Sequence, residues 1–267
     1  MAKSTFSYET AAILINLARE AYNDRSELGI KQYGFELVHY IESTNTDTQC
    51  YIARDEKKKR IVIAFRGTSS VQDLLTDIII LQTIYPPTRR LFFKPRVHAG
   101  FLEAYKSVKK EIHAHLNTLF SEQGSSRLFV TGHSLGGALA TIAAVDLNQT
   151  FKLPVTIYTY GSPKVGNSWF ARKFNRKIKD SFRIANVDDV IPSYPPVIGY
   201  NHINSLVFID KKGNIDTKPS ALEQIIEKLD DTLIVLTGQV LKKHASELYQ
   251  SALNSSLDKQ NEKASGR

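Results

Sequence analysis

The sequence predicts an α/β fold, with a mostly parallel central sheet and helices on both of its faces. Apolar, β-branched runs that are typical of buried strands alternate with helical patterns along nearly the whole chain. One junction between a strand and a helix also carries a Gly-x-Ser-x-Gly sequence at residues 132–136, which is typical of a sharp turn at the edge of such a sheet.

The first half of the chain begins with an amphipathic helix at about residues 8–23. Strands follow at about 34–41 and 49–54, where aromatic and β-branched residues are frequent. A charged turn then leads into residues 60–65, an unbroken apolar run that indicates a fully buried strand. A long helix is expected at about 99–121, before the strand that carries the Gly-x-Ser-x-Gly sequence.

The middle of the chain repeats the alternation of strand and helix. Residues 127–130 form a short apolar strand, and the small residues at 138–144 favour a helix directly after the turn. Further strands are expected at 155–160 and near 182–186, with a helix at about 168–178 between them. This order is typical of parallel strands joined by helical crossovers.

The last part of the chain is expected to hold a strand hairpin around Lys211, Lys212 and Gly213, and then a helical stretch at about 220–253. The chain has no internal repeat and no linker that would divide it into two cores. Residues 1–253 are therefore predicted to form a single domain, and residues 254–267 a polar, disordered tail.

The charge composition restricts the possible partners. The 267 residues include 35 Lys and Arg against 27 Asp and Glu, which gives a formal net charge of +8. A positive surface favours anionic lipid or nucleic acid. The basic clusters are accompanied by no zinc-ligand spacing, phosphate-binding loop or nucleic-acid motif, so we expect no metal and no nucleic-acid partner.

The N-terminal sequence and the cysteine content bear on location. The apolar stretch at 11–18 contains Asn16 and runs directly into Arg19, which indicates an amphipathic helix and not a signal peptide. The longest apolar stretch elsewhere, at 78–81, is too short to span a bilayer. Cys50, the only cysteine, excludes an internal disulfide and is expected in the core. We expect a soluble protein, cytoplasmic or exported by a non-classical route.

The turn at 132–136 is the strongest functional signal. In a nucleophile elbow, the sharp turn exposes the serine hydroxyl at the sheet edge, and here that serine is Ser134. The flanking glycines are needed because a Cβ atom would clash where the strand and helix approach each other. The backbone N–H of Leu135, at the helix start, would face a developing oxyanion. The alternative is a glycine-rich turn that serves only packing.

A nucleophilic serine needs a base and an acid that orients the base. The acids in a suitable loop after Ser134 are Asp188 and Asp189, which follow a buried strand. The histidines after them are His202 and His244. The residues alone leave both choices open.

Five motifs in order resemble the class 3 (fungal-type) lipases of the α/β-hydrolase fold. The resemblance runs from about the strand at 60–65 to the last helix. The motifs are IAFRGTSS (63–70), VHAGF (97–101), GHSLGGALA (132–140), YGSPKVGN (160–167) and DVIP (189–192), the last with Pro195 and Pro196 nearby.

This resemblance implies a role for particular residues. The catalytic acid falls on Asp189, and the general base falls on His244, which has the His-x-x-x-x-Tyr setting at 244–249. His202 corresponds to a histidine that is not the base. Thr68 would supply a second oxyanion donor beside Leu135. No metal or organic cofactor is implied.

The resemblance also implies a lid over the serine. The segment at 70–81 is expected to form an amphipathic helix, with Ser70 as its N-cap. Together with the apolar runs at 84–87 and 91–93 and the cations around them, it resembles a surface that docks on lipid, including anionic lipid. The lid residues are Val71, Leu74, Leu75, Ile78 and Ile79.

The implied activity is hydrolysis of lipid esters, as in an acylglycerol lipase or a phospholipase A. One alternative is a feruloyl-type esterase of the same fold, against which the apolar segment at 78–93 argues. The other is a catalytically silent relative that acts in signalling or as a scaffold, which would be expected to lack part of the Ser–Asp–His set.

Overall fold

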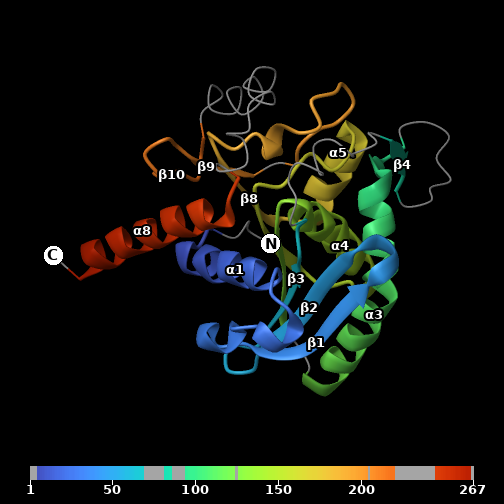
Figure 1. Ribbon diagram of the computed structural model, residues 1–267, viewed down its shortest axis with the longest axis horizontal. Coiled ribbons are helices and arrows are strands. Elements are labelled where there is room, and N and C mark those ends of the chain that lie inside the picture. The colour runs from blue at the N-terminus through green and yellow to red at the C-terminus, as the bar shows by residue number, and fades with distance from the viewer. Residues whose placement is uncertain are drawn as a thin grey trace.

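The computed structural model describes residues 5–68, 81–85, 94–123, 126–203, 205–219 and 244–265. In these residues, the centre of the molecule is an eight-stranded sheet with the strand order β1-β2-β3-β6-β7-β8-β9-β10 (Figure 1). Its strands are β1 (Glu36–Ser43), β2 (Thr48–Asp55), β3 (Arg60–Phe65), β6 (Arg127–His133), β7 (Val155–Tyr160), β8 (Asp180–Asn186), β9 (Leu206–Ile209) and β10 (Ile215–Asp216).

The five inner strands, β3, β6, β7, β8 and β9, run parallel to one another, whereas β1, β2 and β10 pair antiparallel at the two edges. Every residue of β3 is buried, because helices cover both faces of the sheet at this position. The register places Ile63 beside Val130 and Val130 beside Ile157, which gives one continuous apolar row. The prediction of a mostly parallel sheet is confirmed.

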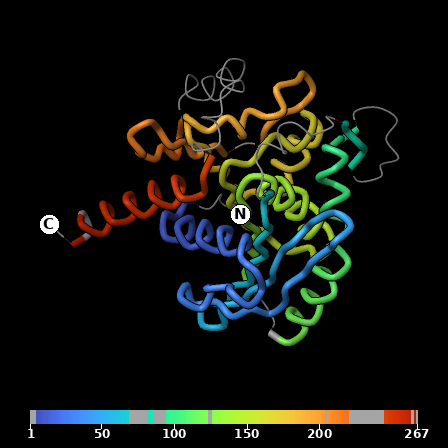
Figure 2. The backbone as a smooth tube through the Cα atoms, viewed as in Figure 1, coloured from blue at the N-terminus to red at the C-terminus, as the bar shows by residue number. Residues whose placement is uncertain are grey.

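Helices cover both faces of the sheet (Figure 2). On one face, α3 (Ala99–Gln123), α4 (Leu135–Phe151) and α5 (Ser168–Lys177) enclose the larger hydrophobic core. On the other face, α1 (Tyr8–Glu20) and α8 (Ser246–Ala264) pack side by side, although they come from opposite ends of the chain. Cys50 is buried in the first core, as expected.

Two segments differ from the expectations. The disordered tail predicted from residue 254 is wrong for most of its length, since α8 continues to Ala264. Tyr249, Ala252 and Leu253 anchor this helix to the core, and extending an anchored helix costs little because each added residue forms a further hydrogen bond. Residues 220–243 of the expected helix at 220–253 lie outside the described residues.

The second difference concerns the segment expected to dock on lipid. Strand β4 (Gln82–Ile84) pairs with β5 (Arg96–His98) in a small separate sheet. Tyr85 is buried in the core, and its hydroxyl donates to the carbonyl of Ile142 at 3.3 Å. Part of the apolar run at 84–87 is therefore core. The expected lid helix, with Val71, Leu74, Leu75, Ile78 and Ile79, lies outside the described residues.

Candidate active site

Ser134 lies at the junction of β6 and α4. Its backbone has φ of 57° and ψ of −130°, a conformation that residues other than glycine rarely adopt. The turn is possible only with glycine on both sides. A Cβ atom on Gly132 would lie 2.3 Å from the carbonyl carbon of Gly136, and one on Gly136 would lie 2.2 Å from the carbonyl oxygen of Phe65. The sequence thus gives the strained strand-to-helix turn that defines a nucleophile elbow.

Asp189 lies in the loop that follows β8 and is buried. One of its carboxylate oxygens, Oδ2, accepts hydrogen bonds from His244 Nδ1 at 2.8 Å and from the Tyr249 hydroxyl at 2.6 Å. The other, Oδ1, accepts from the backbone N–H of Ile191 at 2.9 Å. Of the two acids that the residues alone left open, Asp189 is bonded to His244.

His244 precedes α8 and is almost completely buried. Its Nδ1 is bonded to Asp189, whereas its Nε2 has no hydrogen-bond partner within the described part of the chain. The same holds for the buried hydroxyl oxygen of Ser134. The two atoms that would exchange a proton in a serine hydrolase therefore both lack a hydrogen-bond partner among the described residues. His202 instead bonds through its ring to the carbonyl oxygen of Pro192.

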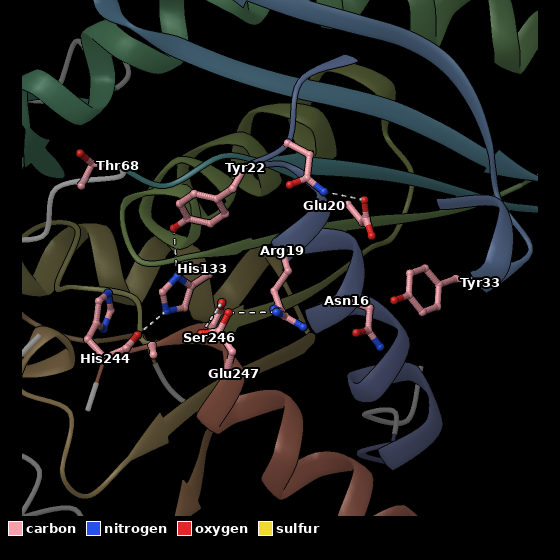
Figure 3. Close-up of a pocket in the computed structure, with 12 residues that line it drawn as sticks. Asn16, Arg19, Glu20, Tyr22, Tyr33, Thr68, His133, His244, Ser246 and Glu247 are labelled. Carbon is pink, nitrogen blue, oxygen red and sulfur yellow. Dashed lines mark hydrogen bonds and ion pairs between the residues drawn. The ribbon is translucent and has the colours of Figure 1, made fainter. Parts of the chain in front are cut away.

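His133 and Tyr22 form a second layer behind His244 (Figure 3). His133 Nε2 lies 2.8 Å from the carbonyl oxygen of His244, and His133 Nδ1 lies 3.0 Å from the Tyr22 hydroxyl. Burial lowers the pKa of His133 well below its ordinary value, and the neighbouring His244 lowers it further. The ring is neutral, so Nε2 carries its proton and donates to the carbonyl, while Nδ1 accepts from Tyr22.

Sequence reasoning did not find this second layer. His133 adjoins Ser134 in the turn, which is a usable signal, but nothing in the sequence around Tyr22 connects it with a turn more than a hundred residues away. The role of Tyr249 as a donor to Asp189 was likewise not predicted, although its spacing from His244 was noted. Tyr22 can approach this part of the chain closely because residue 67 is a glycine. A Cβ atom on Gly67 would lie 2.1 Å from the Tyr22 hydroxyl.

A cavity of about 450 Å³ opens beside His244 and His133. Thr68, which follows β3, forms part of its wall, and Arg19 and Glu247 form an ion pair of 2.9 Å across α1 and α8 at its side (Figure 3). Leu135 is the first residue of α4, so its N–H is among the donors that have no acceptor within the helix. The helix N-terminus favours negative charge there.

The parallel sheet, the helices on both of its faces and the elbow define an α/β-hydrolase fold. Residues 62–199 match the sequence profile of the family described as Lipase (class 3), and the chain belongs to this family. It is 35% identical to secreted mono- and diacylglycerol lipase 1 of Fusarium solani over 175 aligned residues. The alignment covers 65% of this chain and 51% of that protein. It is also 35% identical to a lipase of Rhizomucor miehei over 161 aligned residues, and this alignment covers 58% of this chain and 43% of that protein.

Solved structures show the same fold. The lipase of Rhizopus microsporus var. chinensis superposes with a TM-score of 0.72 at 28% identity, covering 92% of this chain and 93% of that one. A triacylglycerol lipase whose catalytic centre is described as a serine protease triad superposes with a TM-score of 0.70 at 29% identity, covering 78% and 82%. The chain spans about half the length of the curated relatives it matches.

Within the described residues, no helix combines the length and the apolar character that crossing a membrane requires.

Proposed function

We propose that this chain is a serine carboxylic ester hydrolase that cleaves acylglycerol-type lipid esters. Its family supports this reaction class, and relatives named as mono- and diacylglycerol lipases support this substrate class. The observation that carries the proposal is the hydrogen bond of 2.8 Å between His244 Nδ1 and Asp189, combined with a His244 Nε2 that has no hydrogen-bond partner among the residues the structure describes.

In the proposed reaction, the hydroxyl of Ser134 attacks the ester carbonyl while His244 Nε2 takes its proton. Asp189 orients the imidazole and balances its positive charge. His244 then protonates the departing alcohol, which leaves an acyl group on Ser134. A water molecule, deprotonated by His244 in the same way, attacks this acyl group. The bond to Ser134 Oγ then breaks, His244 returns the proton to that oxygen, and the fatty acid is released.

The oxyanion formed in each step needs donors that are already in place. We assign this role to the backbone N–H of Leu135 and to Thr68, through its N–H and hydroxyl. Leu135 supports the assignment by its position at the N-terminus of α4, and Thr68 by its position in the wall of the cavity beside His244. The loss of one such donor costs roughly 100- to 1000-fold in turnover.

Binding to a lipid surface, including anionic lipid, is part of the proposal. The lid in this proposal consists of Val71, Leu74, Leu75, Ile78 and Ile79. Exposed apolar side chains support it. Gln82 Nε2 donates to the carbonyl of Gly199 at 3.0 Å, which joins two segments that carry such side chains. Five large apolar residues are exposed in the described part of the chain. Four of them lie in these two segments: Leu81, Ile84, Val197 and Ile198.

The experiment is hydrolysis of p-nitrophenyl esters of short to long acyl chain, dissolved and in micelles, by the parent protein and three variants. Ser134→Ala and His244→Asn should lose at least about 1000-fold in kcat, and His202→Asn should remain largely active. A folded parent protein without activity on any ester would favour the silent, scaffold-type relative. Preference for aromatic, soluble esters over lipid esters would favour the feruloyl-type esterase.

The site of action is also a proposal. Some of the relatives are named as secreted lipases. We propose action in the cytoplasm or after export, and fractionation of producing cells into medium and cytosol distinguishes the two.

A further inference from the structure

We propose that His39, Glu111 and His115 form a binding site for a divalent transition-metal ion, with zinc as the best match. Each residue offers one ligand atom, and the three atoms lie within 4.8 Å of one another. No ligand spacing in the sequence predicts this site, because His39 lies 72 positions before Glu111. It is independent of the proposed ester hydrolysis.

Two elements bring the three side chains together. Glu111 and His115 are four residues apart on α3, and residues at this spacing lie on the same face of a helix. His39 comes from the edge strand β1, against which α3 packs. Its Nε2 lies 2.6 Å from Glu111 Oε1, and its ring is stacked on that of His115 with centroids 3.8 Å apart.

The donor set determines which ion fits. Two imidazole nitrogens and one carboxylate oxygen suit Zn²⁺, with a water molecule in the fourth tetrahedral position. Calcium and magnesium prefer sites made entirely of oxygen ligands. The His39 and Glu111 side chains are 29% and 47% exposed, which leaves room for that water and for exchange of the ion.

The position of the site indicates its role. None of its three residues is among those that line the cavity beside His244. A bound ion would instead join the edge strand β1 to α3 and stabilise the folded chain by mass action. We therefore assign it a stabilising role, and not a role in ester hydrolysis.

For the test, the full chain is freed of metals by chelation and then titrated with ZnCl₂. Calorimetry measures the affinity, and thermal unfolding measures the melting temperature. We expect one ion per chain at this site and a rise in Tm. His39→Gln, Glu111→Gln and His115→Gln should each lower the affinity roughly ten-fold or more and abolish the rise. His113→Gln is the matched control, because His113 lies on the same helix but bonds to Asp146 at 2.7 Å.

Electron paramagnetic resonance with Cu²⁺ identifies the ligands directly. Coupling to two imidazole nitrogens in the parent protein, and to one in His39→Gln or His115→Gln, supports the site. The proposal is overturned if the chain does not bind zinc, or if the three substitutions leave the affinity and the Tm response equal to those of His113→Gln.

Discussion

The imidazole ring of His133 is stacked on that of His244, with the ring centroids 4.5 Å apart and the planes inclined by 28°. His133 also donates a hydrogen bond to the backbone carbonyl of His244. It therefore holds both the ring and the main chain of the proposed base. Because His133 adjoins Ser134, one short segment of chain carries the proposed nucleophile and positions its partner.

Replacing His133 by phenylalanine should keep the stacked ring and remove the bond to the carbonyl of His244. We expect kcat on a dissolved ester to fall about ten-fold or more, with a smaller change in KM, because the imidazole is less well aligned. Steady-state kinetics measures both values.

The matched control is Tyr22→Phe, which leaves the bond from His133 to His244 in place. This variant should lose about 1–3 kcal/mol of unfolding free energy, since His133 Nδ1 is left buried without a donor, but kcat should change little. Equal loss of kcat in both variants would contradict a positioning role for His133.

Ser134 should be a source of strain as well as the nucleophile. Its positive φ is expected to destabilise the folded state by on the order of 1–3 kcal/mol, and glycine at this position would not be strained. Ser134→Gly and Ser134→Ala should both be inactive, but the glycine variant should be the more stable by about 1 kcal/mol. Urea unfolding measures the difference, and equal stabilities would show that the turn is not strained.

Tyr249 should affect both activity and stability. Its hydroxyl donates to Asp189 at 2.6 Å and accepts from the backbone N–H of Asn186 at 3.2 Å. Tyr249→Phe should lower the unfolding free energy by about 1–3 kcal/mol and kcat by about ten-fold, because Asp189 is held less firmly.

Tyr51→Phe is the control for this prediction. The Tyr51 hydroxyl is also buried and donates to the carbonyl of Leu17 at 2.7 Å, away from Asp189. It should lose similar stability and keep its kcat. If kcat falls equally in both variants, the effect of Tyr249 on activity is only a general effect of destabilisation.

Asp146 should make stability depend on pH in the acid range. Burial alone would raise the pKa of its carboxyl, but hydrogen bonds from His113, Lys109 and Tyr105 outweigh burial and lower the pKa to about 2. Since the folded-state pKa is depressed, the stabilisation is complete above the ordinary value of 3.8 and is lost as the pH falls toward 2.

Asp146→Asn should therefore lower the unfolding free energy by about 1 kcal/mol at neutral pH, after allowance for solvent screening. The difference from the parent protein should shrink as the pH falls from about 4 to about 2. Urea unfolding at several pH values measures it. A difference that stays constant over this range would contradict the role given to the charge.

Local sequence was enough for the elements whose signal is short-ranged. The strands predicted at 60–65 and 155–160 appear with the same bounds, as β3 and β7. Both are apolar runs in the interior of a parallel sheet, where burial on two faces determines the composition. The elbow was equally visible, because its Gly-x-Ser-x-Gly pattern spans only five residues. The clash at Gly132 arises within the elbow itself, whereas the clash at Gly136 is with the backbone of Phe65 on β3.

The contacts between distant segments required the tertiary structure. From the residues alone, Asp188 was equivalent to Asp189 and His202 to His244; the resemblance to the lipases selected one of each. The bond between Asp189 and His244 joins residues 55 positions apart, and it depends on how the loop after β8 meets the start of α8. Tyr22 reaches His133 only because α1 packs on the same face of the sheet as α8. Periodicity tells which face of an element is buried, but not which distant side chain it meets there.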